Sequence, residues 1–115
     1  MNELFAFKIL TRPQYDQFRA DGLFGGAPVD IADGYIHMST RDQAAETAAK
    51  HFAGQDDLVM LMIDLAAYGD AIKWEESRGG ALFPHLYGDL TMASVAGKVV
   101  LRIGDDGLHQ FPAGF

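Results

Sequence analysis

Residues 34–54, GYIHMSTRDQAAETAAKHFAG, carry the clearest local pattern in the chain, a short apolar segment followed at once by a helical repeat. The apolar side chains of the repeat recur at a spacing that places them on one face of a helix: Ala44, Ala45, Ala48, Ala49 and Phe52. Gly54 then favours a helix end, because glycine readily adopts the left-handed conformation that closes many helices. The stretch therefore predicts a strand over residues 35–38 and a helix over residues 40–52.

The segment that precedes this stretch predicts a strand, a short helix and a loop. Residues 3–10 are rich in apolar and aromatic side chains, as in a strand. Thr11 can cap a short helix that carries Tyr15 and Phe18 on one face. Residues 21–34 contain several glycines and a proline, which favour a loop.

The segment that follows the stretch predicts three more strands. Residues 58–65, LVMLMIDL, form an apolar run without alternation, which is typical of a strand covered on both faces. Residues 72–76 alternate, and residues 99–103 form the last clear strand. The intervening stretch over residues 78–90 is rich in turn-forming residues and predicts loops. Together these segments predict an α+β fold with a mostly antiparallel sheet and two main helices.

Composition limits the domain organisation and the partners. A chain of 115 residues is expected to form a single domain over residues 1–115, which buries about two-thirds of its unfolded surface. No apolar run approaches the roughly 20 residues of a membrane helix, and no signal peptide or cysteine is present, so we expect a cytoplasmic protein and no membrane partner. The formal net charge of −7 disfavours nonspecific binding to nucleic acid, and the oligomeric state stays open.

His37, Ser39 and Thr40 form the first candidate site, because they lie where the predicted strand meets the predicted helix. Ser39 or Thr40 can cap the helix, and the free amides of a helix start also favour an anion such as phosphate or carboxylate. His37 has two interpretations. It is either a half-buried histidine bonded to a backbone carbonyl or a catalytic group with an imidazole that titrates near neutral pH.

Arg78, His85 and Tyr87 form the second candidate site, in a glycine-rich stretch that allows sharp turns and close approach of a ligand. The alternative is an ordinary turn in which Arg78 is solvated, His85 is a hydrogen-bonded loop residue and Tyr87 belongs to the core. Glu75 and Glu76 do not predict an acid–base pair, because adjacent residues of a strand point to opposite faces. We expect no metal site, since the four histidines lie far apart without H-x-x-x-H spacing.

Both candidate sites share motifs with a known family. The run GYIHMST followed by an alanine-rich helix, then Trp74, the pattern E..RGG.LFPHLYG and a closing apolar strand resemble the small bacterial family called domain of unknown function 952. The resemblance covers nearly the whole chain. It implies an ADP-ribosyltransferase-like α+β fold, with NAD as a substrate.

The resemblance also implies roles for individual residues. In the wider group a histidine of an H-x-S/T strand contacts a ribose hydroxyl of NAD, a tyrosine of the second motif stacks on nicotinamide, and a late glutamate steers the reacting ribose. His37 and Ser39 match the first element, and Tyr87 matches the second. The chain departs from the pattern in two ways, because Met38 replaces the usual glycine and no glutamate follows Glu76.

Three functional hypotheses follow. The first is an NAD- or nucleotide-using transferase in which His37 and His85 are catalytic, while Ser39, Thr40, Arg78 and Tyr87 bind the ligand. The second is a module that uses the same pocket to bind a nucleotide or a phosphorylated metabolite without turnover. The third is a structural partner module whose polar side chains serve turns and caps. The first two predict that the site residues converge on one cleft.

Overall fold

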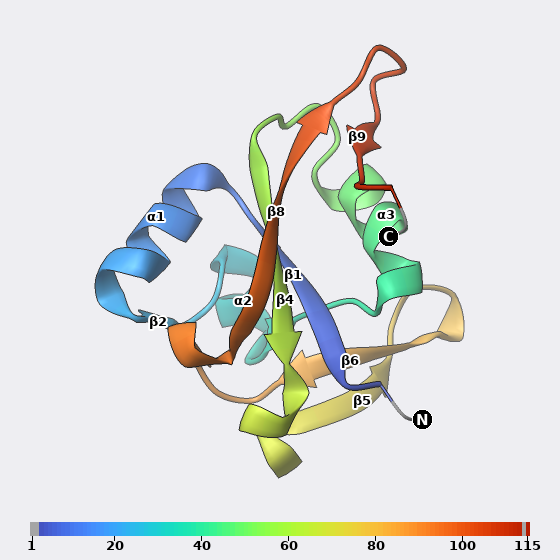
Figure 1. The fold of residues 1–115 in the computed structure, drawn as a ribbon. Helices are drawn as coiled ribbons and strands as arrows, with labels where there is room; N and C mark the ends of the chain where they lie inside the picture. The colour runs from blue at the N-terminus through green and yellow to red at the C-terminus, as the bar shows by residue number, and fades with distance from the viewer. Residues whose placement is uncertain (1–2, 114) are drawn as a thin grey trace.

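The computed structural model describes residues 3–113 and residue 115, apart from the side chain of Arg78, and it forms an α+β fold (Figure 1). Every strand pairing within this part of the chain is antiparallel. The larger sheet has the order β1-β4-β8-β9, and its strands are β1 (Phe5–Leu10), β4 (Leu58–Asp64), β8 (Val95–Ile103) and β9 (His109–Gln110). The predicted fold class is therefore confirmed at the level of an antiparallel α+β domain.

Helices α1 (Arg12–Asp21) and α3 (Arg41–His51) lie on opposite sides of this sheet, as Figure 1 shows. Strand β4 packs against both. Its side chains alternate between two hydrophobic clusters: Val59, Leu61 and Ile63 pack with Tyr15 and Phe18 of α1, whereas Leu58 and Met60 pack with Ala44 and Ala48 of α3. The prediction of a strand covered on both faces is confirmed.

Helix α1 begins as its sequence predicts. Thr11 is the N-cap, and its Oγ1 accepts the backbone N–H of Gln14 at 3.3 Å, while Oε1 of Gln14 accepts the Thr11 N–H at 2.9 Å. This reciprocal arrangement satisfies two donors that a helix start leaves free. The helix ends at Gly22, which has a φ of +76°. Tyr15 and Phe18 are buried, as predicted.

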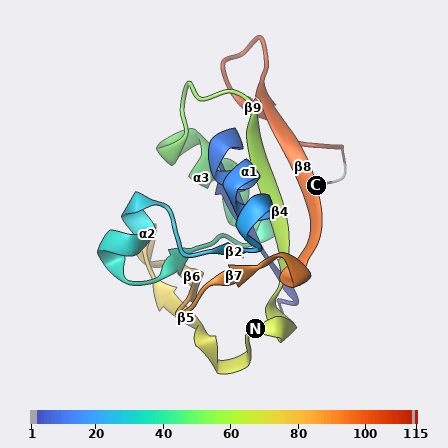
Figure 2. The same ribbon diagram turned by 90° about the vertical axis from the view of Figure 1, so that its left-hand side faces the viewer.

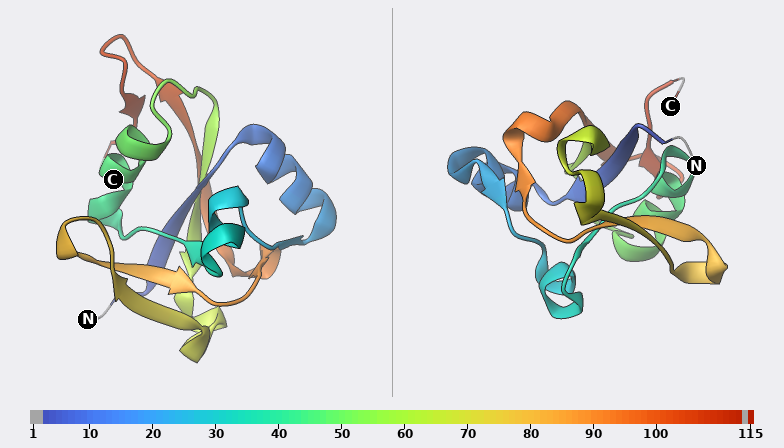
Figure 3. Two further views of the ribbon diagram at one scale, coloured as in Figure 1. Left: turned by 180° about the vertical axis from the view of Figure 1, so that it is seen from behind. Right: turned by 90° about the horizontal axis from the view of Figure 1, so that it is seen from below.

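A smaller sheet has the order β3-β6-β5 and runs across the lower end of β1 and β4 (Figures 1 and 3). Its strands are β3 (Ile36–His37), β6 (Leu82–Leu86) and β5 (Ile72–Glu76). The backbones of Phe7 and Ser39 exchange two hydrogen bonds, at 2.8 and 2.9 Å, and the N–H of Met38 donates to the carbonyl of Pro84 at 3.1 Å. The residues just after β3 therefore join the two sheets.

The loop predicted over residues 21–34 is wrong in part. It contains β2 (Leu23–Phe24), which pairs with β7 (Leu90–Thr91) below α1, and the helix α2 (Pro28–Asp33) (Figure 2). Helix α2 lacks the usual amphipathic pattern because it buries Asp30 and exposes Val29 and Ile31. Hydrophobic periodicity cannot detect a helix whose buried residue is charged.

The stretch predicted as loops over residues 78–90 is also partly wrong, since β6 and the start of β7 lie in it. Pro84 in the middle of β6 masks the strand, because proline is rare in a central strand. Strand β8 begins four residues earlier than predicted, at Val95. Short turns of 3-10 helix connect the later strands, at Leu65–Ala67, Gly69–Ala71, Arg78–Gly80 and Met92–Ser94. None of the helices in residues 3–113 is long and apolar enough to cross a membrane.

Candidate functional site

His37 and His85 lie side by side at the junction of the two sheets. They are direct partners in the antiparallel pairing of β3 with β6, and their ring centroids are 5.5 Å apart. Both residues line one cavity of about 520 Å³, whose apolar walls include side chains of β1, α2 and β6, while α3 contributes Thr47 and His51. His37 and Ser39 of the first predicted site and His85 of the second therefore line the same pocket.

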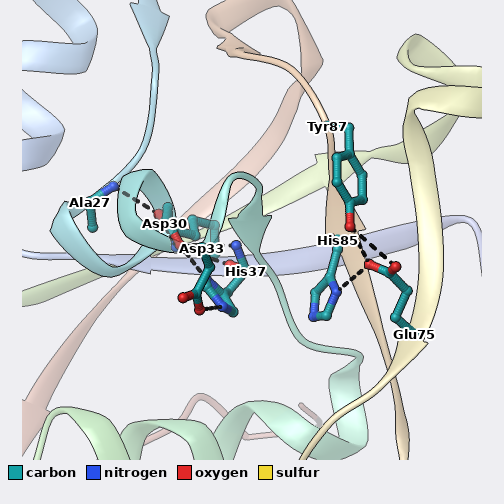
Figure 4. Close-up of polar contacts among 8 residues, drawn as sticks. Ala27, Asp30, Asp33, His37, Glu75, His85 and Tyr87 are labelled. Atoms are coloured by element: carbon teal, nitrogen blue, oxygen red, sulfur yellow. Dashed lines mark hydrogen bonds and ion pairs between the residues drawn. The ribbon is translucent and has the colours of Figure 1, made fainter.

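Asp30 fixes the position of His37. Its Oδ1 accepts both the backbone N–H of His37 at 3.0 Å and the ring Nδ1 at 2.6 Å (Figure 4). Its Oδ2 accepts the backbone N–H of Ala27 at 2.8 Å and Nζ of Lys8 at 2.9 Å. Lys8 also donates to the carbonyl of His37 at 2.9 Å. Four donors, from β1, from β3 and from Ala27 at the N-cap of α2, thus converge on one carboxylate.

This network is buried, since Asp30 is 1% exposed and Lys8 is 6% exposed. Burial by itself raises the pKa of Asp30, because it penalises the charged carboxylate. The hydrogen bonds from His37 and the charge of Lys8 outweigh that effect, so the pKa of Asp30 lies well below its ordinary value. Asp30 is therefore a permanent anion at neutral pH.

Asp33 occupies the opposite side of the His37 ring. Its Oδ2 lies 2.9 Å from Nε2 of His37, and its carboxylate is about half exposed at the end of α2. Asp33 also lines the cavity. His37 therefore has a buried carboxylate at Nδ1 and a solvent-accessible carboxylate at Nε2 (Figure 4).

Glu75 plays the corresponding part for His85. Its Oε1 lies 2.8 Å from Nδ1 of His85 and accepts the hydroxyl of Tyr87 at 2.8 Å (Figure 4). The contacts with His85 and Tyr87 lower the pKa of Glu75, and the same carboxylate raises the pKa of the Tyr87 hydroxyl. Unlike Asp30, the Glu75 side chain is 40% exposed.

Tyr35 connects the two histidines through its ring. It stacks on His85 at 4.1 Å between centroids and lies 4.7 Å from His37 and 5.2 Å from Tyr87. Partial burial raises the pKa of Tyr35, and the charges of Asp33 and Glu75 raise it further. The site thus combines aromatic faces with negative charge.

The remaining predicted residues are placed differently. Ser39 is buried, lines the cavity and bonds Oγ1 of Thr47 at 2.8 Å. Thr40 is buried at the N-cap of α3, where its backbone N–H donates to Oε1 of Gln43 at 2.9 Å. Tyr87 is 41% exposed and reaches the site through Glu75. The side chain of Arg78 lies outside the described residues.

The predicted convergence is therefore only partly confirmed. Among the described side chains, the cavity lining includes His37, Ser39 and His85 but not Thr40 or Tyr87. The first interpretation of His37 also needs correction, because its ring bonds two carboxylates and not a backbone carbonyl.

Five residues of the site were not predicted from the sequence: Lys8, Asp30, Asp33, Tyr35 and Glu75. Two of them carried a detectable signal. Lys8 is a single charge inside an apolar strand, and a buried charge requires a partner. Asp30 stands between two apolar residues, which is unusual for an exposed turn. Within residues 3–113, no group of three histidine, aspartate or glutamate side chains is arranged to hold a metal ion.

Comparisons with known proteins place the chain among proteins without a stated activity. Residues 9–98 match the family described as "Protein of unknown function (DUF952)". The X-ray structure of protein CC0527 from Caulobacter crescentus has 47% sequence identity and a TM-score of 0.88, over 92% of this chain and 93% of that one. Its solution NMR structure has 46% identity and a TM-score of 0.84, over 94% and 93% of the two chains. No curated protein matches.

Proposed function

The chain belongs to the family described as protein of unknown function DUF952, and we propose that it is an ADP-ribosyltransferase-like domain that uses NAD or a related nucleotide. One observation carries this proposal. Two histidines, each held by a carboxylate at Nδ1, occupy paired strand positions and open onto one cavity. Such a pair places proton donors and acceptors where a ligand can reach them.

The cavity has the size and lining of a ligand site. About 520 Å³ falls within the range of small-molecule pockets, roughly 300–1,000 Å³. Phe7, Phe83 and Met38 provide apolar walls for a planar ring, while His37, Asp33 and Ser39 provide polar groups that suit ribose hydroxyls. The ribosyl–base end of a nucleotide therefore fits the pocket better than its phosphates.

The charges of the site suit cleavage of a bond between ribose and a cationic base. When the C1′–N bond of NAD breaks, the electron pair leaves with nicotinamide and positive charge develops on the ribose carbon. The carboxylate of Asp33 borders the cavity and can stabilise that charge. The oxygen of water or of an acceptor hydroxyl forms the new bond to C1′, and its proton passes to a histidine.

Binding without turnover is the second candidate. Asp33 contacts Nε2 of His37, and the late glutamate of the transferase pattern has no counterpart after Glu76. A pocket that binds a nucleotide without cleaving it needs no such glutamate. A hydroxyl of the ligand would then hydrogen-bond to both Asp33 and His37.

Thermal unfolding with NAD, ADP-ribose and nicotinamide tests the proposal, followed by chromatography for released nicotinamide. A ligand at 100 times its dissociation constant stabilises a protein by about 2.7 kcal/mol. We expect NAD to stabilise the wild type, and His85→Asn to weaken this effect and nicotinamide release.

The control is His109→Gln, because His109 lies outside the cavity lining and bonds the carbonyl of Gln55. It should leave both ligand effects unchanged. Stabilisation without release of nicotinamide would favour the binding module. If none of the three compounds stabilises the protein, the pocket does not serve these ligands and the proposal is wrong.

A further inference from the structure

The ring nitrogens of His37 and His85 face different surroundings in a matched way. In both residues Nδ1 contacts a carboxylate oxygen, Asp30 Oδ1 at 2.6 Å and Glu75 Oε1 at 2.8 Å. A carboxylate only accepts hydrogen bonds when it is ionised, so each Nδ1 must carry a proton. By the same argument Nε2 of His37 carries a proton while it contacts Oδ2 of Asp33 at 2.9 Å, so the His37 ring is then protonated at both nitrogens. In His85 the carboxylate contact is at Nδ1, which leaves Nε2 as the nitrogen for proton exchange.

We propose that Asp30 and Glu75 are positioning residues that keep Nδ1 of both histidines protonated, so that proton exchange with a ligand takes place at Nε2. That Nε2 meets the ligand rests on the proposed function. The protonation of Nδ1 does not depend on it, because it follows from contacts within the protein.

Asp30 makes this arrangement rigid at His37. Its two oxygens already accept from Lys8 and from the backbone N–H groups of Ala27 and His37. These contacts fix the carboxylate even if the ring of His37 moves. Nε2 of His37 then lies between the cavity and Asp33, where a proton can be shared with that carboxylate.

Glu75 makes a more adaptable arrangement at His85. Its Oε1 accepts from both His85 and Tyr87, and the Glu75 side chain is partly exposed to solvent, whereas His85 is 2% exposed. Figure 4 shows the Nε2 side of the His85 ring turned away from Glu75 and toward His37. Loss of the Glu75 charge should therefore change the tautomer of His85 without disturbing His37.

The experiment is nitrogen-15 NMR of the histidine rings at neutral pH. We expect a protonated Nδ1 in both His37 and His85 of the wild type, and a protonated Nε2 in His37 as well while it contacts Asp33. His109 is an internal control with the opposite pattern, because its Nε2 lies 2.7 Å from the carbonyl of Gln55 and must carry the proton.

Two variants separate positioning from general structure. In Glu75→Leu the acceptor at Nδ1 is removed, so Nδ1 of His85 should no longer be held protonated, while the His37 ring stays as in the wild type. Tyr87→Phe removes the other bond to Glu75 and should leave Nδ1 of His85 protonated. If NAD binds, Glu75→Leu should weaken its binding by about tenfold, as expected for one lost hydrogen bond.

Each outcome decides a separate point. A wild-type spectrum in which Nδ1 of either ring lacks a proton overturns the inference without any variant. An unchanged His85 in Glu75→Leu removes the role of Glu75. If Nδ1 of both rings is protonated but no nucleotide binds, the proposed function fails while the positioning of the rings stands.

Discussion

Asp30 shows how a single residue can organise a site. Its side chain is buried, although charged side chains are usually exposed. Four hydrogen-bond donors compensate for its lost hydration. A buried ion pair contributes little to the free energy of unfolding while both partners are present. Removal of one partner is strongly destabilising, because it leaves an uncompensated buried charge. Asp30 therefore connects the stability of the fold to the geometry of His37.

Asp30→Asn should destabilise the protein by about 3 kcal/mol, because it leaves Lys8 buried without an anionic partner. Urea unfolding at neutral pH measures this loss. Asp33→Asn is the matched control, since Asp33 contacts the same ring from a half-exposed position, and it should cost less than about 1 kcal/mol. Equal losses in the two variants would contradict the special role of Asp30.

His37→Ala should affect both stability and binding. The ring is partly exposed, but it supplies one of the donors to Asp30, so we expect a loss of about 1 kcal/mol in unfolding free energy. Binding of a nucleotide should weaken as well, by about 0.5 to 3 kcal/mol. Urea unfolding and ligand titration of the same variant separate the two effects. A lowered urea midpoint with unchanged affinity would make His37 purely structural.

At the scale of elements, α2 and the glycines around it position the site. Gly26 has a φ of +123°, and a Cβ at this position would lie 2.8 Å from Cβ of Asp30. Gly34, which ends α2, also has a positive φ of +88°, but its Cβ would meet open space. Close approach at Gly26 thus lets Asp30 reach its buried position.

Gly26→Ala should therefore destabilise the protein more than Gly34→Ala. Both variants incur the cost of a left-handed conformation, about 1 kcal/mol, but only Gly26→Ala also forces Asp30 to move. Thermal unfolding of both variants compares them directly. Chemical shifts of His37 should change in Gly26→Ala and stay close to wild type in Gly34→Ala, and the reverse result would contradict this view of α2.

At the scale of the whole molecule, the two sheets meet through the backbones of Phe7 and Ser39, with the Lys8–Asp30 pair beside that junction. The pKa of Asp30 is lowered in the folded protein, so the stability that this carboxylate provides is complete above its unfolded pKa of about 3.9. As the pH falls below that value, the unfolded chain binds a proton that folded Asp30 does not bind. The folded state then loses stability.

The unfolding free energy of the wild type should therefore decrease steeply below about pH 4, and the decrease should be smaller in Asp30→Asn. Urea unfolding at several pH values between 6 and 3 gives both curves. Exposed carboxylates with lowered pKa values, such as Asp56 and Asp57, are present in both proteins and cancel in the comparison. Parallel curves would show that Asp30 does not govern the acid response.

The sequence by itself determined the elements whose signals are local. Strand β1 was predicted from its apolar and aromatic content, and β4 from an apolar run without alternation. Helix α3 was predicted from the spacing of its apolar side chains, and Thr11 was identified because a cap acts over three residues. His37 and His85 were identified as candidates from their motifs, and their roles stay predictions. The tertiary structure alone decided that these two histidines pair, and that Asp30 and Glu75 hold them. The physical reason is that the pairing of β3 with β6 and the burial of Asp30 depend on contacts between residues far apart in the chain, which leave no periodic trace in the sequence.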